Sequence, residues 1–341
     1  SGRMTRVGFQ KKEDFRFVTL LPDESESALK AFVTIMKGCD NFCSFCIVPA
    51  VRGREICRDP DDILREIDAL VDLGVREVTL LGQNVNSYGV GRHEKASGMI
   101  SFDRLLERIA NRTGVERIRF TTSHPKDLSE ALIAQFSANK KLAKNFHLPV
   151  QSGSDAVLEK MYRGYTVEEY IAKLERLRRA CPDLAVSTDV IVGFCSESEA
   201  DFSATLELLK SSRFDSIFSF VYSPRPKTTA GLYFADDVPE AVKRDRLARV
   251  QALQEKITLE RNKSWEGKIL EVLVEGPSRQ GMTYSGRSSQ NHAVHFSGTE
   301  ADVGRTLPIF IRHAGPNSLR GEKYVGGQSQ FDTHEGHGTH H

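Results

Sequence analysis

The sequence has no apolar run that approaches the length needed to cross a bilayer, and its opening residues show no signal-peptide pattern. The chain also lacks an excess of either charge, because 47 Lys and Arg residues against 46 Asp and Glu residues leave a net charge of +1. Any basic surface must therefore be local rather than global. These absences predict a cytoplasmic protein with no membrane partner.

Cysteine is scarce, with six residues in a chain of 341, which excludes a disulfide framework. Three of the six, Cys39, Cys43 and Cys46, fall within eight residues of each other. In a cytoplasmic protein such crowding indicates metal binding rather than crosslinking.

The spacing CxxxCxxC suits a 4Fe-4S cluster that has three thiolate ligands and one iron left open. An open iron can bind the amino and carboxylate groups of S-adenosylmethionine (SAM), and electron donation then splits a carbon–sulfur bond to give a 5′-deoxyadenosyl radical. A structural zinc site is the rival interpretation. Zinc in such sites takes four ligands, and no fourth Cys or His lies near the three cysteines.

Strand and helix patterns alternate from about residue 30, which predicts parallel strands joined by crossover helices. The expected strands are 31–36, 77–81, 117–122, 145–150, 185–192 and 216–222. The expected helices are 59–73, 102–110, 128–136, a short one after Ser154, 167–180 and 197–210. The fold class is therefore α/β, a partial (β/α)6 barrel, whose site should lie at the C-terminal ends of its strands.

The remaining segments complete the expected organisation: a linker over 1–26, the barrel domain over 27–260, a small all-β barrel over 265–325 and a disordered tail over 326–341. Residues 239–264 are expected to form one long charged helix. Its cations Lys243, Arg244, Arg246 and Arg249 are interleaved with acids, which is typical of an exposed helix face.

Several longer segments extend the cysteine motif: MKGCDNFC (36–43), RGRE (52–55), LGQNVNSYG (81–89), SHP (123–125), HLPVQSGS (147–154), RGYT (163–166), STDVIVGF (187–194) and YSPRP (222–226). With these segments the chain resembles the MiaB-like radical SAM tRNA methylthiotransferases over about residues 30–325. The C-terminal module resembles the RNA-binding TRAM domain of that family. One departure is Cys195-Ser196-Glu197 where the family usually has Pro-Gly-Glu, and we expect Glu197 to keep its role and Cys195 to pack.

This resemblance implies methylthiolation of an isopentenyl-adenosine beside the tRNA anticodon. The partners would be the tRNA anticodon stem-loop and an electron donor such as flavodoxin or ferredoxin. The family also has an N-terminal domain whose auxiliary 4Fe-4S cluster donates the sulfur, and no such domain is recognisable here. We therefore expect this chain to supply SAM cleavage and tRNA binding without completing the transfer. The alternatives are a ribosomal-protein aspartate methylthiotransferase and a SAM- and RNA-binding fragment without turnover.

The candidate SAM-binding residues lie in the cysteine loop or at strand ends. Phe45 is expected near the adenine of SAM, although simple loop packing would also explain it. Gly82, Gln83 and Asn84 are expected near the methionine end, against the alternative of a capped turn. The other candidates, for which a solvated loop or surface position is the rival interpretation, are Ser123, Gln151, Ser187, Asp189 and Arg225. His124 and His147 are expected to be structural or substrate-lining rather than metal ligands.

The candidate RNA-binding residues are basic. Arg52 and Arg54 follow the cysteine loop, where they would contact a substrate phosphate or pack the loop on a helix. Within the β module we expect RNA contacts from Arg279, Arg287 and His292.

Overall fold

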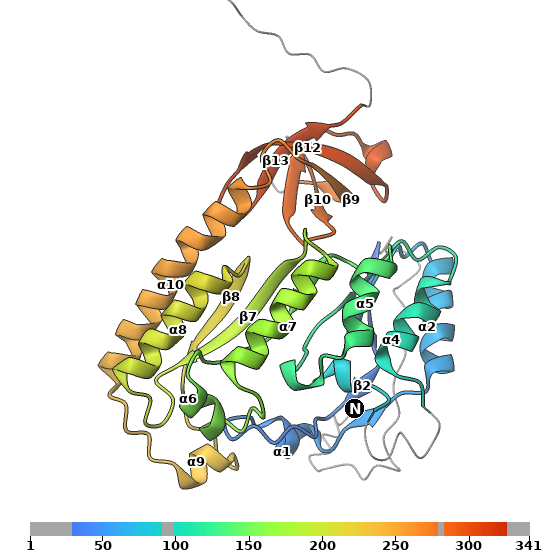
Figure 1. The fold of residues 1–341 in the computed structure, drawn as a ribbon. Helices are drawn as coiled ribbons and strands as arrows, with labels where there is room; N and C mark the ends of the chain where they lie inside the picture. The colour runs from blue at the N-terminus through green and yellow to red at the C-terminus, as the bar shows by residue number, and fades with distance from the viewer. Residues whose placement is uncertain (1–28, 91–98, 279–282, 326–341) are drawn as a thin grey trace, which may run out of the picture.

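Six parallel strands form the first part of the computed structural model, which describes residues 29–90, 99–278 and 283–325 (Figure 1). They make two three-stranded sheets: β1 (Lys30–Thr34), β4 (Glu77–Leu81) and β5 (Arg117–Phe120), then β6 (Asn145–His147), β7 (Ala185–Val192) and β8 (Ser216–Val221). A parallel bridge between Ile118 and Leu142 links β5 to the segment that leads into β6. The predicted partial barrel of six strands is therefore confirmed.

Helices cover the outer face of these strands, and local sequence explains where they begin and end. The larger ones are α2 (Pro60–Asp72), α4 (Phe102–Ala110), α5 (Glu130–Ala138), α7 (Val167–Ala180), α8 (Glu199–Ser212) and α10 (Glu240–Lys263). Asp59 caps α2 by accepting the amide hydrogens of Asp61 and Asp62, and Pro60 occupies its first position. Thr166 and Glu169 form a capping box at the start of α7.

Strand residues alternate between the helix-covered face and an inner face. Val78, Leu80 and Ile118 are fully buried under the helices, as are Val186 and Val190. The inner face carries most of the polar and charged side chains of the strands, together with several exposed aromatics.

Several expected elements differ from the observed ones. The strand expected over 31–36 divides into β1 and a two-residue β2 (Met36–Lys37), which pairs with β3 (Ile56–Cys57). Two short helices, α1 (Val48–Arg52) and α9 (Thr229–Tyr233), were not expected, whereas the predicted α6 (Asp155–Lys160) is present. The helix expected to begin at residue 128 begins at Glu130, because Ser129 caps it.

A closed five-stranded barrel follows α10 and matches the predicted all-β module. Its strands are β9 (Ile269–Pro277), β10 (Tyr284–Ser288), β11 (Ala293–Phe296), β12 (Thr306–Ala314) and β13 (Leu319–Lys323), in the order β10-β11-β13-β12-β9. Leu270, Val272, Val294, Ile309 and Ile311 form its core. The expected linker 1–26 and tail 326–341 lie outside the described residues.

The β barrel packs against the N-terminal ends of the parallel strands, away from α1 and the cysteine loop (Figure 1). Arg119 donates to the carbonyls of Ser288 (2.7 Å) and Ser289 (3.1 Å), and Arg117 donates to the carbonyl of Arg287 (2.9 Å). Glu77 pairs with both arginines, so these contacts are buried and charge-compensated. The inner face is thus closed at one end by the β barrel and bordered at the other by the cysteine loop. Within the described ranges, no helix has both the length and the apolarity that a membrane crossing requires.

Candidate functional site

The three clustered cysteines lie on the loop between β2 and α1, at the C-terminal ends of the parallel strands (Figure 1). Cys39 and Cys43 are buried and Cys46 is half-buried. Gly38 begins the loop with a φ of +73°, and a side chain there would put its Cβ 2.1 Å from the carbonyl oxygen of Arg54. Only glycine therefore allows the loop to pack this closely against the RGRE segment.

Backbone hydrogen bonds hold the loop on both sides. Gln83 accepts the amide hydrogen of Gly38 through its side chain at 2.5 Å, which gives this predicted SAM-site residue a loop contact. On the other side, the hydroxyl of Ser44 donates to the carbonyl of Lys160 at 2.7 Å, and the backbone carbonyl of Ser44 accepts from the amide of Ala230 at 2.7 Å. These contacts fix the loop to α6 and α9 before any ligand binds.

Arg163 is the one buried cation whose guanidinium hydrogen-bonds to a cysteine of this loop in the described parts of the chain. Its Nη1 lies 3.2 Å from the sulfur of Cys43, Nη2 donates to the carbonyl of Pro149 at 2.8 Å, and Nε donates to the hydroxyl of Tyr165 at 2.9 Å. Burial alone would lower the pKa of Arg163, but the charges of Tyr165 and Cys43 outweigh it, so its pKa is raised. Arg163 therefore places a buried, charged hydrogen-bond donor beside the middle sulfur of the loop.

His124 approaches Cys43 from the other side, with Nε2 3.8 Å from the sulfur. Its Nδ1 accepts the amide hydrogen of Lys126, so the remaining ring hydrogen lies on Nε2 and points toward sulfur. Burial lowers the pKa of His124 to about 2, which keeps the ring neutral. In this arrangement His124 is a hydrogen-bond donor to the cysteine loop.

The three thiols form one electrostatic group that fits the predicted cluster. Burial, with smaller contributions from the nearby Cys43 and Cys46, raises the pKa of Cys39 to about 12. In the described ranges, no three His, Cys, Asp or Glu side chains are arranged to hold a single metal ion. A cubane cluster would take one thiolate on each of three irons, which three cysteines can supply.

Two buried polar atoms beside the cysteine loop have no protein partner among the described residues: the amide oxygen of Asn84 and the hydroxyl of Ser123. Asn84 also donates to Asp127 at 2.7 Å, and Asp127 accepts from Asn41 of the cysteine loop at 3.1 Å. An unpaired buried polar group is costly, so these atoms are suited to a polar ligand. Gly82 has a packing role, because a Cβ there would lie 2.4 Å from the side chain of Met36.

Gln151 ends the segment after β6 in a left-handed conformation, with a φ of +77°. Its backbone bridges to β7, donating to the carbonyl of Asp189 and accepting from Ile191, both at 2.9 Å. A non-glycine residue in this region is strained and is held by its surroundings. The backbone of Gln151 is therefore fixed against Asp189 and Ile191 of β7.

Ser187 and Asp189 contact His147 on the inner face rather than the cysteine loop. His147 Nδ1 lies 2.9 Å from the hydroxyl of Ser187, and Nε2 lies 3.3 Å from Asp189 Oδ1. The sequence analysis placed Ser187 and Asp189 among the SAM-binding candidates. Their partner is a histidine nearer the β barrel.

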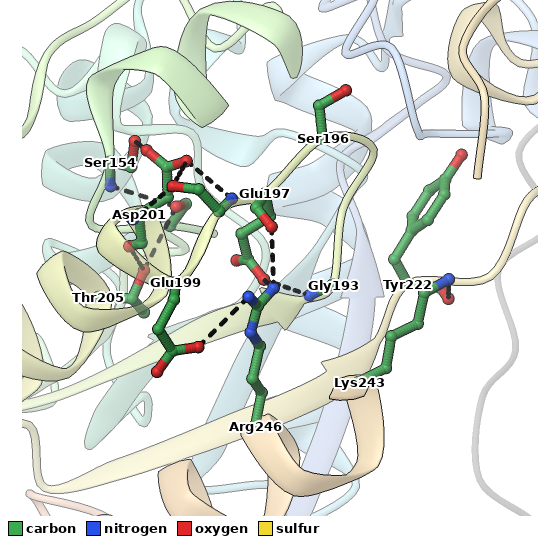
Figure 2. Close-up of polar contacts among 12 residues, drawn as sticks. Ser154, Gly193, Ser196, Glu197, Glu199, Asp201, Thr205, Tyr222, Lys243 and Arg246 are labelled. Carbon is green, nitrogen blue, oxygen red and sulfur yellow. Dashed lines mark hydrogen bonds and ion pairs between the residues drawn. The ribbon is translucent and has the colours of Figure 1, made fainter. Parts of the chain in front are cut away.

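The loop after β7 closes through a buried ion pair. Glu197 accepts the amide hydrogen of Gly193 at 2.6 Å and pairs with Arg246 of α10 at 2.8 Å, and Figure 2 shows Glu197 and Glu199 converging on this arginine. Cys195 packs with Phe194 and Tyr222, and Phe45 packs against the same cluster. The expectations for Glu197 and Cys195 therefore agree with the geometry.

The cations of α10 do not all lie on an exposed face, which corrects the prediction. Lys243 and Arg246 are buried, whereas Arg244 and Arg249 are exposed. Lys243 pairs with Asp236 and lies beside the ring of Tyr222 (Figure 2). Periodicity alone could not reveal these partners, because they lie on loops that precede the helix.

The predicted RNA-binding residues fall in two places. Arg52 and Arg54 are exposed near the cysteine loop, and Arg54 pairs with Asp40 and lies 5.0 Å from the ring centre of Phe42. Arg225, a candidate for the SAM site, is exposed as well. Arg287 and His292 lie at the β10–β11 turn, where His292 packs against Trp265 and the carbonyl of Arg287 binds Arg117. Arg279 lies outside the described residues.

Sequence reasoning missed Arg163 and Asp127 as site residues. Both stand in or beside segments that carried the family resemblance, RGYT and SHP, but nothing local to either residue indicates its partner. Only the fold brings Arg163 to Cys43 and Asp127 to Asn41.

Comparisons with known proteins agree with this geometry. A profile of the radical SAM superfamily matches residues 33–209, and one of the TRAM domain matches residues 263–324. The curated tRNA-2-methylthio-N(6)-dimethylallyladenosine synthase of Geotalea uraniireducens (strain Rf4) is 49% identical over 320 residues, covering 94% of this chain and 71% of that protein. Proteins of the same name from Syntrophobacter fumaroxidans (strain DSM 10017 / MPOB) and Syntrophus aciditrophicus (strain SB) are 54% and 53% identical over 86% of this chain, which spans 63% of each.

Among solved structures, coproporphyrinogen III oxidase (HemN) from Escherichia coli, described as a radical SAM enzyme, superimposes with a TM-score of 0.50 and 15% identity. The match covers 77% of this chain and 67% of that one, and at this identity it shows the fold alone.

Proposed function

Because this chain belongs to the radical SAM superfamily and, within it, to the family of tRNA-2-methylthio-N(6)-dimethylallyladenosine synthases, we propose that it supplies SAM cleavage and tRNA binding for methylthiolation of N(6)-dimethylallyladenosine beside the tRNA anticodon. Its cofactors are a 4Fe-4S cluster and SAM. A tRNA substrate would place the protein in the cytoplasm, and a flavodoxin or ferredoxin would serve as electron donor.

The observation that carries this proposal is the buried group of Cys39, Cys43 and Cys46 with Arg163 hydrogen-bonded to the central sulfur. When bound there, a 4Fe-4S cluster supplies the electron for reductive cleavage of SAM. The chain's own contribution is to hold the thiols in place. Arg163 and His124 direct their hydrogens at Cys43, and the hydrogen bonds of Ser44 fix the loop.

The SAM molecule would lie between the cysteine loop and the ends of β4, β5 and β6. Asn84 and Ser123 offer unpaired buried polar atoms there, and Gln151 and Phe45 border the same region. Asp127 positions Asn84 by accepting its amide hydrogen. Arg225 remains a candidate for the carboxylate of SAM or a phosphate of the RNA, since its side chain is exposed.

For tRNA we propose contacts on two sides: the exposed Arg52 and Arg54 near the site, and the TRAM-like barrel beyond it. Single-stranded loops such as the anticodon loop can present unstacked bases to a protein interior. The contact between the β barrel and the strand ends would keep these two RNA surfaces at a fixed separation.

The test compares two substrates on the anaerobically reconstituted chain. An anticodon hairpin RNA carrying N(6)-dimethylallyladenosine should bind and change the yield of 5′-deoxyadenosine, whereas a ribosomal-protein peptide containing the target aspartate should do neither. Binding of the peptide alone would favour the ribosomal-protein alternative. RNA binding without any 5′-deoxyadenosine would favour a binding module without turnover.

A further inference from the structure

A hydrogen-bonded group of three side chains lies on the inner face, between the cysteine loop and the β barrel. His147 on β6 contacts Ser187 and Asp189 on β7 through its two ring nitrogens, at 2.9 Å and 3.3 Å. The cysteine-loop contacts described above do not include any of the three residues. The strand register shows how far these residues lie from the β barrel. Asn145, the inner-face residue of β6 before His147, contacts Arg119 at the β-barrel end, so His147 lies one inner-face position closer to the cysteine loop.

Two aromatic side chains stand beside this group on the neighbouring edge strand. Phe218 pairs in register with Asp189, and Phe220 with Ile191. Phe218 is 57% exposed and Phe220 52%, although both belong to a strand of the sheet rather than to a surface loop. The ring of Phe218 meets the ring of His147 edge-on, with centroids 5.7 Å apart.

We propose that Asp189, His147, Phe218 and Phe220 form the recognition site for the N6-alkylated adenine of the RNA substrate. We call these four residues the inner-face patch. This inference rests on the proposed function and deepens it, since it assigns the residues that distinguish the modified base from ordinary adenosine. It also moves Asp189 from the SAM site, where the sequence placed it, to the RNA substrate.

The chemistry of the patch matches that base. Both nitrogens of His147 are already engaged, so His147 is a positioning residue that orients the carboxylate of Asp189. A carboxylate accepts hydrogen bonds, and an adenine with one alkyl group on N6 retains one N6–H to donate. Exposed phenylalanine rings supply the surface on which an unstacked base and an apolar alkyl group pack.

The experiment measures RNA binding to the full chain by fluorescence anisotropy without SAM, using three anticodon hairpins. One carries N(6)-dimethylallyladenosine, one carries unmodified adenosine, and one carries the dimethylallyl base with N6 also methylated, which removes the N6–H. The wild-type chain should bind the first hairpin about tenfold more tightly than either of the other two. The Asp189→Ala variant should bind the first and third hairpins alike, and Phe218→Ala should bind the first and second alike.

Matched controls are Asp72→Ala and Leu73→Ala at the exposed end of α2, which should keep the full preference. A thermal unfolding midpoint equal to that of the wild-type chain shows that each variant has folded. Retention of the full preference by Asp189→Ala and Phe218→Ala would overturn the inference, and so would an equal affinity of the wild-type chain for all hairpins. If the wild-type chain binds no hairpin at all, the proposed tRNA function itself fails.

Discussion

The guanidinium of Arg163 lies 3.2 Å from the sulfur of Cys43, although the two residues are 120 positions apart in the chain. Arg163 is buried, and its other hydrogen bonds go to a tyrosine hydroxyl and a backbone carbonyl. A buried cation of this kind needs a negative partner, which an iron–sulfur cluster held by the cysteines would provide. The loop is thus electrostatically prepared to hold a negatively charged iron–sulfur cluster.

Replacing Arg163 with leucine should lower the iron retained after reconstitution well below the roughly four irons of a full cubane. The variant loses both the buried positive charge beside the cluster ligands and the hydrogen bond to the sulfur of Cys43. Iron content and the visible absorption of the cluster are the measurements. Arg179→Leu, an exposed change on the following helix α7, is the control. Equal iron in the Arg163 and Arg179 variants would contradict the role given to Arg163.

Breaking the buried pair of Glu197 and Arg246 should destabilise the chain strongly. Arg246→Met leaves Glu197 buried without its partner, and we expect a loss of about 3 kcal/mol or more in the free energy of unfolding. Arg249→Met removes a solvent-exposed pair with Glu199 and should cost less than about 1 kcal/mol. Denaturant unfolding measures both. Adding Glu197→Gln to Arg246→Met should recover part of the loss, and a further loss would count against this account.

Acid should weaken the contact between the cysteine loop and the end of β4 through Asp127. Burial alone would raise the pKa of Asp127, but hydrogen bonds from Lys126, Asn84 and Asn41 outweigh it and lower the pKa below 3.8. Since the folded-state pKa is depressed, the stabilisation is present above 3.8 and is lost as the pH falls through the lowered value.

The variant Asp127→Asn should therefore lose about 2 kcal/mol at neutral pH and show a shallower decline in stability under acid than the wild-type chain. Urea unfolding across the acidic range is the measurement, with the exposed Asp72→Asn as control. Parallel pH profiles for the wild-type chain and Asp127→Asn would rule out Asp127 as the source of the loss of stability in acid.

The contact between the β barrel and the strand ends should depend on Arg119. Arg119→Met removes the donors to the carbonyls of Ser288 and Ser289 and half of the compensation for Glu77. We expect a loss of about 3 kcal/mol and faster hydrogen exchange in the β10–β11 hairpin. Exposed Arg305→Met should change neither quantity. Unaltered exchange in the hairpin of the Arg119 variant would mean that other contacts hold the β barrel.

The sequence predicted the parts of the fold that depend on strong local patterns. The bounds of β4, α4, α7 and β7 agree with the expected ranges, because regular hydrophobic spacing or strong capping defines each of them. The short pair β2–β3 and the helices α1 and α9 escaped prediction, since elements this brief carry little periodicity. The strand β13 reads Leu-Arg-Gly-Glu-Lys, which is too polar to stand out.

The site was predictable to a similar degree. Cysteine spacing predicts the iron ligands, but the partners of the loop come from distant segments. Arg163 and Asp127 could be identified only in the folded chain, and the same holds for the burial of Lys243 and Arg246. The expected SAM residues separated into two sets in the structure, with Gln83 and Asn84 beside the cysteine loop and Ser187 and Asp189 deeper on the inner face.

The central claim is that Cys39, Cys43 and Cys46 hold a cluster that cleaves SAM, and one anaerobic measurement tests it most directly. The reconstituted chain, reduced with dithionite in the presence of SAM, should form 5′-deoxyadenosine. Cys43→Ala should abolish the product, and Cys181→Ala, a buried cysteine outside the loop, should leave it intact. Product formation that persists in Cys43→Ala, or that is absent from the wild-type chain despite a full iron content, would contradict the account.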